Sequence, residues 1–183
     1  MFKVLSRSVL IALATITLGA CVTSQKPIFG PDTRVLPFSP LLKFESYKRQ
    51  RVGDPWEKSG SGTYFSADNR LVVREVDERG EPANKSSYTF HPLSPGRFLL
   101  QWRDNDQAPY AYAYLTVRDG EYFIDGFFCR EVDGPAFRQG GGTTTQGDDK
   151  VCKLDTVKEP EKMLRAFADR SRGPQFRFVP VTR

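Results

Sequence analysis

The sequence predicts a mainly β protein, an antiparallel β-sandwich or a small barrel or meander, with one C-terminal α-helix followed by a last edge strand. Short segments alternate apolar and polar residues, which is the period of a strand with one buried face. Turn-forming residues recur between these segments at the spacing expected for a sandwich or barrel. One segment near the C-terminus spaces its apolar residues as a helix does.

The expected strands of the sheet lie between residues 43 and 129. Tyr110–Arg118 alternates strictly, and Asp119-Gly120 is a strong hairpin signal that leads into Glu121–Cys129. The other expected strands are Lys43–Arg49, Gly60–Phe65, Arg70–Val76, Ser87–Pro92 and Arg97–Arg103.

The expected helix follows these strands. Thr156-Val157-Lys158-Glu159 fits a capping box, Pro160 suits the first turn, and Gly173-Pro174 stops the helix. The apolar stripe of this helix consists of Met163, Leu164, Phe167 and Ala168. Gln175–Val181 then alternates, which predicts a last strand, and Pro180 places that strand at a sheet edge or ends it.

Composition indicates one globular domain of common size. The 183 residues are 39% hydrophobic and 13% aromatic, which provides material for a core and argues against a disordered or collagen-like chain. The formal net charge is +5, and basic residues alternate with acidic ones, as in residues 70–79. Such a mixed surface is not typical of nucleic-acid binding, so we expect no nucleic-acid partner.

Residues 1–20 have the composition of a signal peptide. Lys3 and Arg7 form a positive start, and Val9–Leu18 is an uncharged, mostly apolar stretch of ten residues. That length suits the apolar region of a signal peptide and is too short for a membrane-spanning helix, which needs about 20 residues. An ordinary secretory signal that happens to precede Cys21 would show the same pattern.

Leu18-Gly19-Ala20-Cys21 resembles the lipobox of bacterial lipoproteins. The resemblance covers residues 1–21 only. It implies that residues 1–20 are removed and that Cys21 becomes an acylated N-terminus with three chains, which would anchor the protein durably in a membrane. In this class, Asp after the cysteine favours the inner membrane. Because Val22 stands there, the resemblance implies the outer membrane, facing the periplasm.

Residues 21–42 are expected to form a proline-rich tether that is partly packed on the domain, with residues 21–26 as the leash. Pro27, Pro31, Pro37 and Pro40 recur in this stretch. Proline removes backbone donors and favours extended structure. Apolar residues between the prolines indicate packing, and residues 43–183 are expected to form the single β-rich domain.

Cys129 and Cys152 are the two cysteines that remain if lipid occupies Cys21. An even pair in an oxidising compartment predicts a disulfide. It would close a loop of about 23 residues and stabilise the fold by about 3 kcal/mol. A metal or redox site is the rival interpretation. The two cysteines form no CxxC motif and the chain has one histidine, so we expect no metal and no cofactor.

His91, the single histidine, is expected to be a structural or surface residue. A general base needs a nucleophile or carboxylate held within reach, and no sequence motif supplies one. No catalytic residue is therefore predicted.

Tyr110, Tyr112 and Tyr114 share one face of their strand. They form either an aromatic platform for a glycan or a partner protein, or a row that lines a barrel or packs under neighbouring strands. In the second case Ala111 and Ala113 would let the C-terminal helix approach closely. Trp56 follows Gly53-Asp54-Pro55 in an expected loop and is a further candidate for an exposed binding surface.

The sequence thus favours a non-enzymatic lipoprotein that binds or scaffolds an envelope protein or glycan in the periplasm. One alternative is a carrier of an apolar small ligand, which would need a barrel cavity of several hundred Å³. Another alternative is a hydrolase that uses His91.

Overall fold

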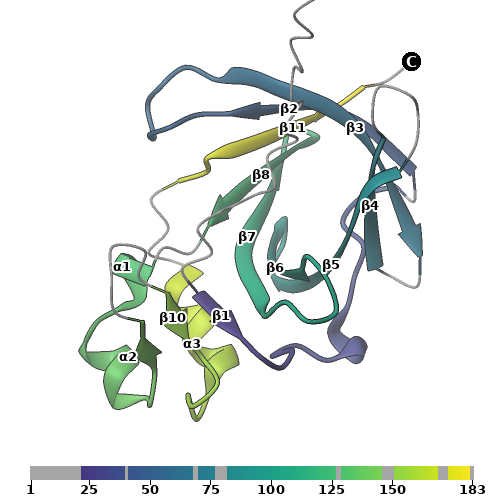
Figure 1. The fold of residues 1–183 in the computed structure, drawn as a ribbon. Helices are drawn as coiled ribbons and strands as arrows, with labels where there is room; N and C mark the ends of the chain where they lie inside the picture. The colour runs from purple at the N-terminus through teal and green to yellow at the C-terminus, as the bar shows by residue number, and fades with distance from the viewer. Residues whose placement is uncertain are drawn as a thin grey trace, which may run out of the picture.

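A computed structural model of the chain describes residues 22–39, 41–67, 70–76, 82–126, 129–145, 151–168 and 173–181 (Figure 1). Within these residues, eight antiparallel strands form a closed barrel. Its strands are β2 (Leu41–Lys48), β3 (Glu57–Ala67), β4 (Arg70–Val76), β5 (Pro82–Ser94), β6 (Arg97–Arg103), β7 (Tyr110–Arg118), β8 (Glu121–Gly126) and β11 (Phe176–Pro180). The mainly β prediction is confirmed, and of its alternatives the structure has the barrel.

The barrel closes through its last strand. Strands β2 to β8 pair in sequence order, and β11 lies between β8 and β2, with Phe178 opposite both Tyr122 and Ser46. The predicted strand after the helix is thus present, but it pairs on both sides and is not an edge strand. Pro180 is its final residue, so the proline ends the strand instead of marking an edge.

Alternation along the strands separates the two faces of the barrel wall. Ala111, Ala113 and Leu115 of β7 point into the barrel, whereas Tyr112 and Tyr114 point outward. The barrel core contains Phe44, Phe90, Leu100, Trp102, Ala111, Ala113, Leu115, Ile124 and Phe178.

A second layer covers the outer face of β6 and β7 (Figure 1). Strand β1 (Val22–Ser24) pairs antiparallel with β7 and parallel with β10 (Cys152–Lys153), which pairs with β9 (Thr143–Thr144). The helices of this layer are α1 (Cys129–Val132), α2 (Pro135–Gln139) and α3 (Pro160–Phe167), and a short 3₁₀ helix, η1 (Pro31–Thr33), lies in the N-terminal segment. A second core, which includes Phe29, Leu99 and Phe137, joins this layer to the barrel.

Helix α3 confirms the predicted stripe but not the predicted cap. Leu164 and Phe167 are buried against the barrel, and Pro160 is the first helical residue. The capping box is wrong, because the Thr156 hydroxyl bonds the Gly141 carbonyl and Glu159 makes no side-chain cap.

The N-terminal segment is more ordered than a tether. Strand β1 begins at Val22, whose side chain is fully buried, and Phe29 is 2% exposed. The expected leash over residues 21–26 is therefore wrong at Val22–Ser24, because backbone pairing with β7 and β10 holds these residues in the sheet. Cys21 lies outside the described residues.

None of the helices in the described part of the chain has the length and apolar character needed to cross a membrane.

Candidate functional site

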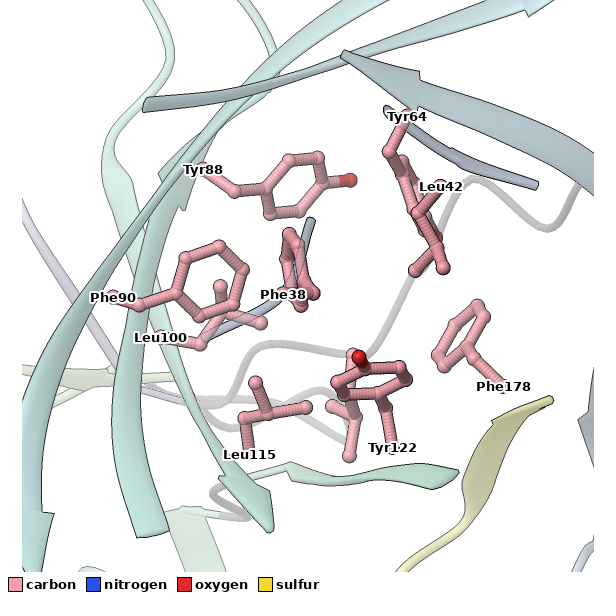
Figure 2. A pocket seen from close by; sticks show the side chains of 10 residues that line it. Phe38, Leu42, Tyr64, Tyr88, Phe90, Leu100, Leu115, Tyr122 and Phe178 are labelled. Atoms are coloured by element: carbon pink, nitrogen blue, oxygen red, sulfur yellow. The ribbon is translucent and has the colours of Figure 1, made fainter. Parts of the chain in front are cut away.

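The interior of the barrel holds an apolar pocket with a cavity of about 40 Å³ (Figure 2). Side chains from seven of the eight barrel strands and from the N-terminal segment surround it, and they are mainly aromatic or aliphatic. The lining residues are Phe38, Leu42, Tyr64, Tyr88, Phe90, Leu100, Leu115, Tyr122, Ile124 and Phe178. The pocket is therefore a place for apolar contact, with tyrosine hydroxyls as its polar groups.

Phe38 occupies the middle of this ring of side chains (Figure 2). Its ring meets those of Phe90 and Tyr122 edge-on, at centroid distances of 5.1 Å and 5.2 Å. The segment that carries Phe38 is fixed to the barrel by a backbone hydrogen bond of 2.9 Å from the Val35 N–H to the Phe90 carbonyl. An N-terminal segment outside the barrel strands thus fills the barrel interior.

The position of Tyr64 in the pocket wall depends on close packing between Phe44 and strand β3. Tyr64 stacks on Phe44 with ring centroids 4.1 Å apart. Gly62 allows Phe44 to lie against β3, because a Cβ at this position would be 2.7 Å from the Phe44 ring. Burial raises the pKa of Tyr122, so its hydroxyl is neutral at physiological pH and can act only as a hydrogen-bonding group.

His91 lies on the other face of β5 and is fully buried. Its Nδ1 is 2.7 Å from the Thr33 hydroxyl, its Nε2 is 3.0 Å from the Thr89 hydroxyl, and its ring stacks on Phe29. Burial, helped by the positive charge of Arg34, lowers the pKa of His91 to about 4. A neutral imidazole fixed between two threonines has the environment of a structural histidine.

The tyrosine row is largely covered by the second layer. The Tyr112 hydroxyl lies 2.6 Å from the Ser24 hydroxyl of β1, and the Tyr114 hydroxyl donates a hydrogen bond of 2.6 Å to the Leu164 carbonyl of α3. Burial raises the pKa of Tyr112 well above its usual value. Tyr112 and Tyr114 are thus no exposed platform, whereas Tyr110 is half-buried at the end of the row.

The expected role of the alanines is wrong. Ala111 and Ala113 face the barrel interior, where they pack in the barrel core. Helix α3 packs on the tyrosine face of β7 instead. This face points out of the barrel, and the second layer, which includes α3, covers it.

Trp56 is half-buried immediately before β3. The Arg49 guanidinium lies over its ring at 4.4 Å, and Phe123 is 6.3 Å away. Neither of these neighbours is one of the three tyrosines, and Trp56 does not line the barrel pocket, so these contacts do not join the four candidate surface residues into a common site.

Cys129 and Cys152 form the predicted disulfide, which joins α1 to β10. Both cysteines are buried, and the chain between them contains α2 and β9. Cys129 was expected to end a strand, but β8 ends at Gly126. Among the described residues no group of three or more His, Cys, Asp or Glu side chains could hold a metal ion.

Comparison of the chain with protein-family models, with curated proteins and with solved structures finds no match. The residues themselves therefore carry the functional argument. Sequence reasoning offered a barrel cavity as one alternative but named none of the residues that line this pocket. Their signal is present, because Tyr88 and Phe90 alternate in one expected strand and Phe38 is an aromatic residue within a proline-rich segment.

Proposed function

We propose that the protein is a lipid-anchored component of the bacterial envelope, on the outer membrane and facing the periplasm, with a non-enzymatic binding or scaffolding role. The observation that supports this role is the packing of the barrel interior. Side chains occupy the interior and leave a cavity of only about 40 Å³. The partner is an envelope protein or a glycan.

The N-terminal sequence and the disulfide support a location in the bacterial envelope. Leu18-Gly19-Ala20-Cys21 has the residues of a lipobox. The Cys129–Cys152 disulfide fits an oxidising environment such as the periplasm, since cytosolic thiols are kept reduced.

The environment of His91 supports a role without catalysis. A general base has to reach the proton that it removes. The His91 ring is fully buried, and the hydroxyls on both of its nitrogens belong to Thr33 and Thr89. The hydrolase alternative is therefore the weakest of the three.

The size of the barrel cavity favours scaffolding over ligand transport. Pockets for small ligands typically have volumes of about 300–1,000 Å³. The barrel cavity is much smaller because Phe38 lies inside it. A barrel packed in this way offers its outer surface, and not its interior, to a partner.

A carrier of an apolar ligand is the second candidate, and Phe38 is the observation that favours it. This residue belongs to no barrel strand, so its ring could be displaced without breaking the barrel's strand pairing. A ligand of similar shape and apolar character would then meet the same aromatic wall.

Native mass spectrometry of the full-length protein, released from its membrane, separates the two roles. The native and denatured masses of the wild type are expected to agree, with and without added naphthalene. Phe38→Ala is expected to bind one naphthalene, because an apolar cavity opens where the ring was. Phe98→Ala, which removes a phenylalanine that does not line the pocket, is the matched control and should bind none.

A stoichiometric small molecule in the wild type, present in the native mass and lost on denaturation, would contradict the scaffolding role. Such a result would establish the carrier instead.

A further inference from the structure

A second, polar pocket of about 460 Å³ lies outside the barrel, where the N-terminal segment crosses the outer face of β5 and β6. Its volume is within the range of about 300–1,000 Å³ that small-molecule sites occupy. The groups that matter for its chemistry are Arg34, Ser87, Thr89, Arg103, Asp104 and Asp106. The pocket shares no lining residue with the apolar pocket of the barrel interior.

Arg34 is held in place by its backbone. Its N–H donates a hydrogen bond of 3.1 Å to the Pro31 carbonyl at the end of η1. The next residue, Val35, donates one of 2.9 Å to the Phe90 carbonyl of β5. These two backbone hydrogen bonds fix the position of the Arg34 Cα atom over the outer face of the barrel.

The Arg34 Nε atom is buried and has no hydrogen-bond partner among the described residues. A buried donor of a charged group that lacks a partner is costly, so proteins normally satisfy such groups. Guanidinium groups bind carboxylates and phosphates through two parallel hydrogen bonds, one of which can come from Nε. An oxyanion in the pocket would supply the missing acceptor once the guanidinium turns its Nε–H from its buried position toward the pocket.

The other charged groups divide the pocket into two ends. Arg103 is already paired, because its Nη2 is 2.6 Å from the Asp106 carboxylate and its Nη1 donates to the Asp106 carbonyl. Asp104 and Asp106 make that end acidic, so a multiply charged anion would be repelled there. Neutral polar side chains also line the pocket, namely Ser87, Thr89, Gln101, Asn105 and Tyr110.

We propose that this pocket binds a small polar ligand through a single oxyanion group, a carboxylate or a phosphate monoanion, held by the Arg34 guanidinium. The rest of the ligand carries hydroxyl or ammonium groups toward Asp104 and Asp106. This site is independent of the barrel interior and of the lipid anchor.

Nuclear magnetic resonance of the arginine Nε–H groups tests the proposal on the full-length protein in detergent and low-chloride buffer. Acetate and inorganic phosphate, titrated separately at pH 6, are the carboxylate and phosphate probes. The Arg34 Nε–H resonance, assigned by its loss in Arg34→Gln, is expected to shift saturably with at least one probe. The probe that shifts it shows which oxyanion the site takes.

Equilibrium dialysis with the radiolabelled form of that probe provides a second measurement. Arg34→Gln is expected to weaken binding at least tenfold. Arg51→Gln removes the same charge from an exposed arginine outside the pocket and should leave binding unchanged. If neither probe shifts the Arg34 resonance saturably, or if Arg34→Gln binds as the wild type does, the proposal is wrong.

Discussion

Removing the Cys129–Cys152 disulfide is expected to lower the free energy of unfolding by about 3 kcal/mol, because the cross-link closes a long loop in the unfolded chain. The two cysteines are 23 residues apart, and beyond α1 the described residues between them contain one short helix, α2, and the two residues of β9. Little regular structure would hold α1 beside β10 without the bond. The double variant Cys129→Ala/Cys152→Ala, compared with the wild type in urea, measures this loss.

Alkylation in denaturant checks the bond itself. Burial alone would protect free thiols in the folded protein, so the test is made after unfolding. Cys129 and Cys152 are expected to stay unmodified until a reductant is added. Alkylation of the unfolded, unreduced protein at both positions would show that the cysteines are free, and an unchanged urea midpoint in the double variant would show that the bond adds no stability.

Phe137→Ala is expected to cost about 3–5 kcal/mol, the usual range for deleting a fully buried phenylalanine. The Phe137 side chain is completely buried in the second core, and it is the buried residue of α2. Gly142 packs against it so closely that a Cβ there would be 2.2 Å from the ring. The surrounding backbone therefore fits this ring, and a smaller side chain would leave a cavity.

Phe137→Leu is the matched control, and it should lose less than half as much stability because most of the apolar volume remains. Urea unfolding followed by circular dichroism measures both variants. A loss below about 1 kcal/mol for Phe137→Ala would mean that the second layer does not contribute to the cooperative fold.

Alternation in the sequence was enough to predict most of the barrel. The observed bounds of β4, β6 and β7 are those expected, and the Asp119-Gly120 hairpin joins β7 to β8. In β6 and β7 the residues alternate because one face of each of these two strands lies in the barrel core. Asp119 has a positive φ of 55°, which an aspartate in a tight turn tolerates.

Alternation could not show which face of β7 is inside. Both faces are buried between Ala111 and Leu115, the alanines in the barrel and the tyrosines under β1 and α3, so neither face carries a charged side chain in this part of the strand. The alternating pattern therefore shows which residues of β7 share a face, but not which face points into the barrel. The small elements β1, β9 and β10 are two or three residues long, and their pairing depends on tertiary contacts that no local pattern records.

The two pockets depend on the route of the N-terminal segment. Phe38 reaches the barrel interior and Arg34 the outer polar pocket because Val35 bonds to β5. Proline spacing indicates an extended segment but not the surface that it follows. The partner of the Thr156 hydroxyl could not be predicted for the same reason. It is the carbonyl of Gly141, which is distant in sequence, so Thr156 does not form the expected capping box.

The intact mass of the protein isolated from the membranes of the cells that produce it tests the lipid anchor most directly. The account predicts a polypeptide that begins at Cys21 with three acyl chains on that residue, and a Cys21→Ser variant that carries no acyl chain and leaves the membrane fraction or remains uncleaved. A protein that begins at Met1, carries no fatty acid and is found in the cytosol would contradict the anchor and, with it, the proposed role in the envelope.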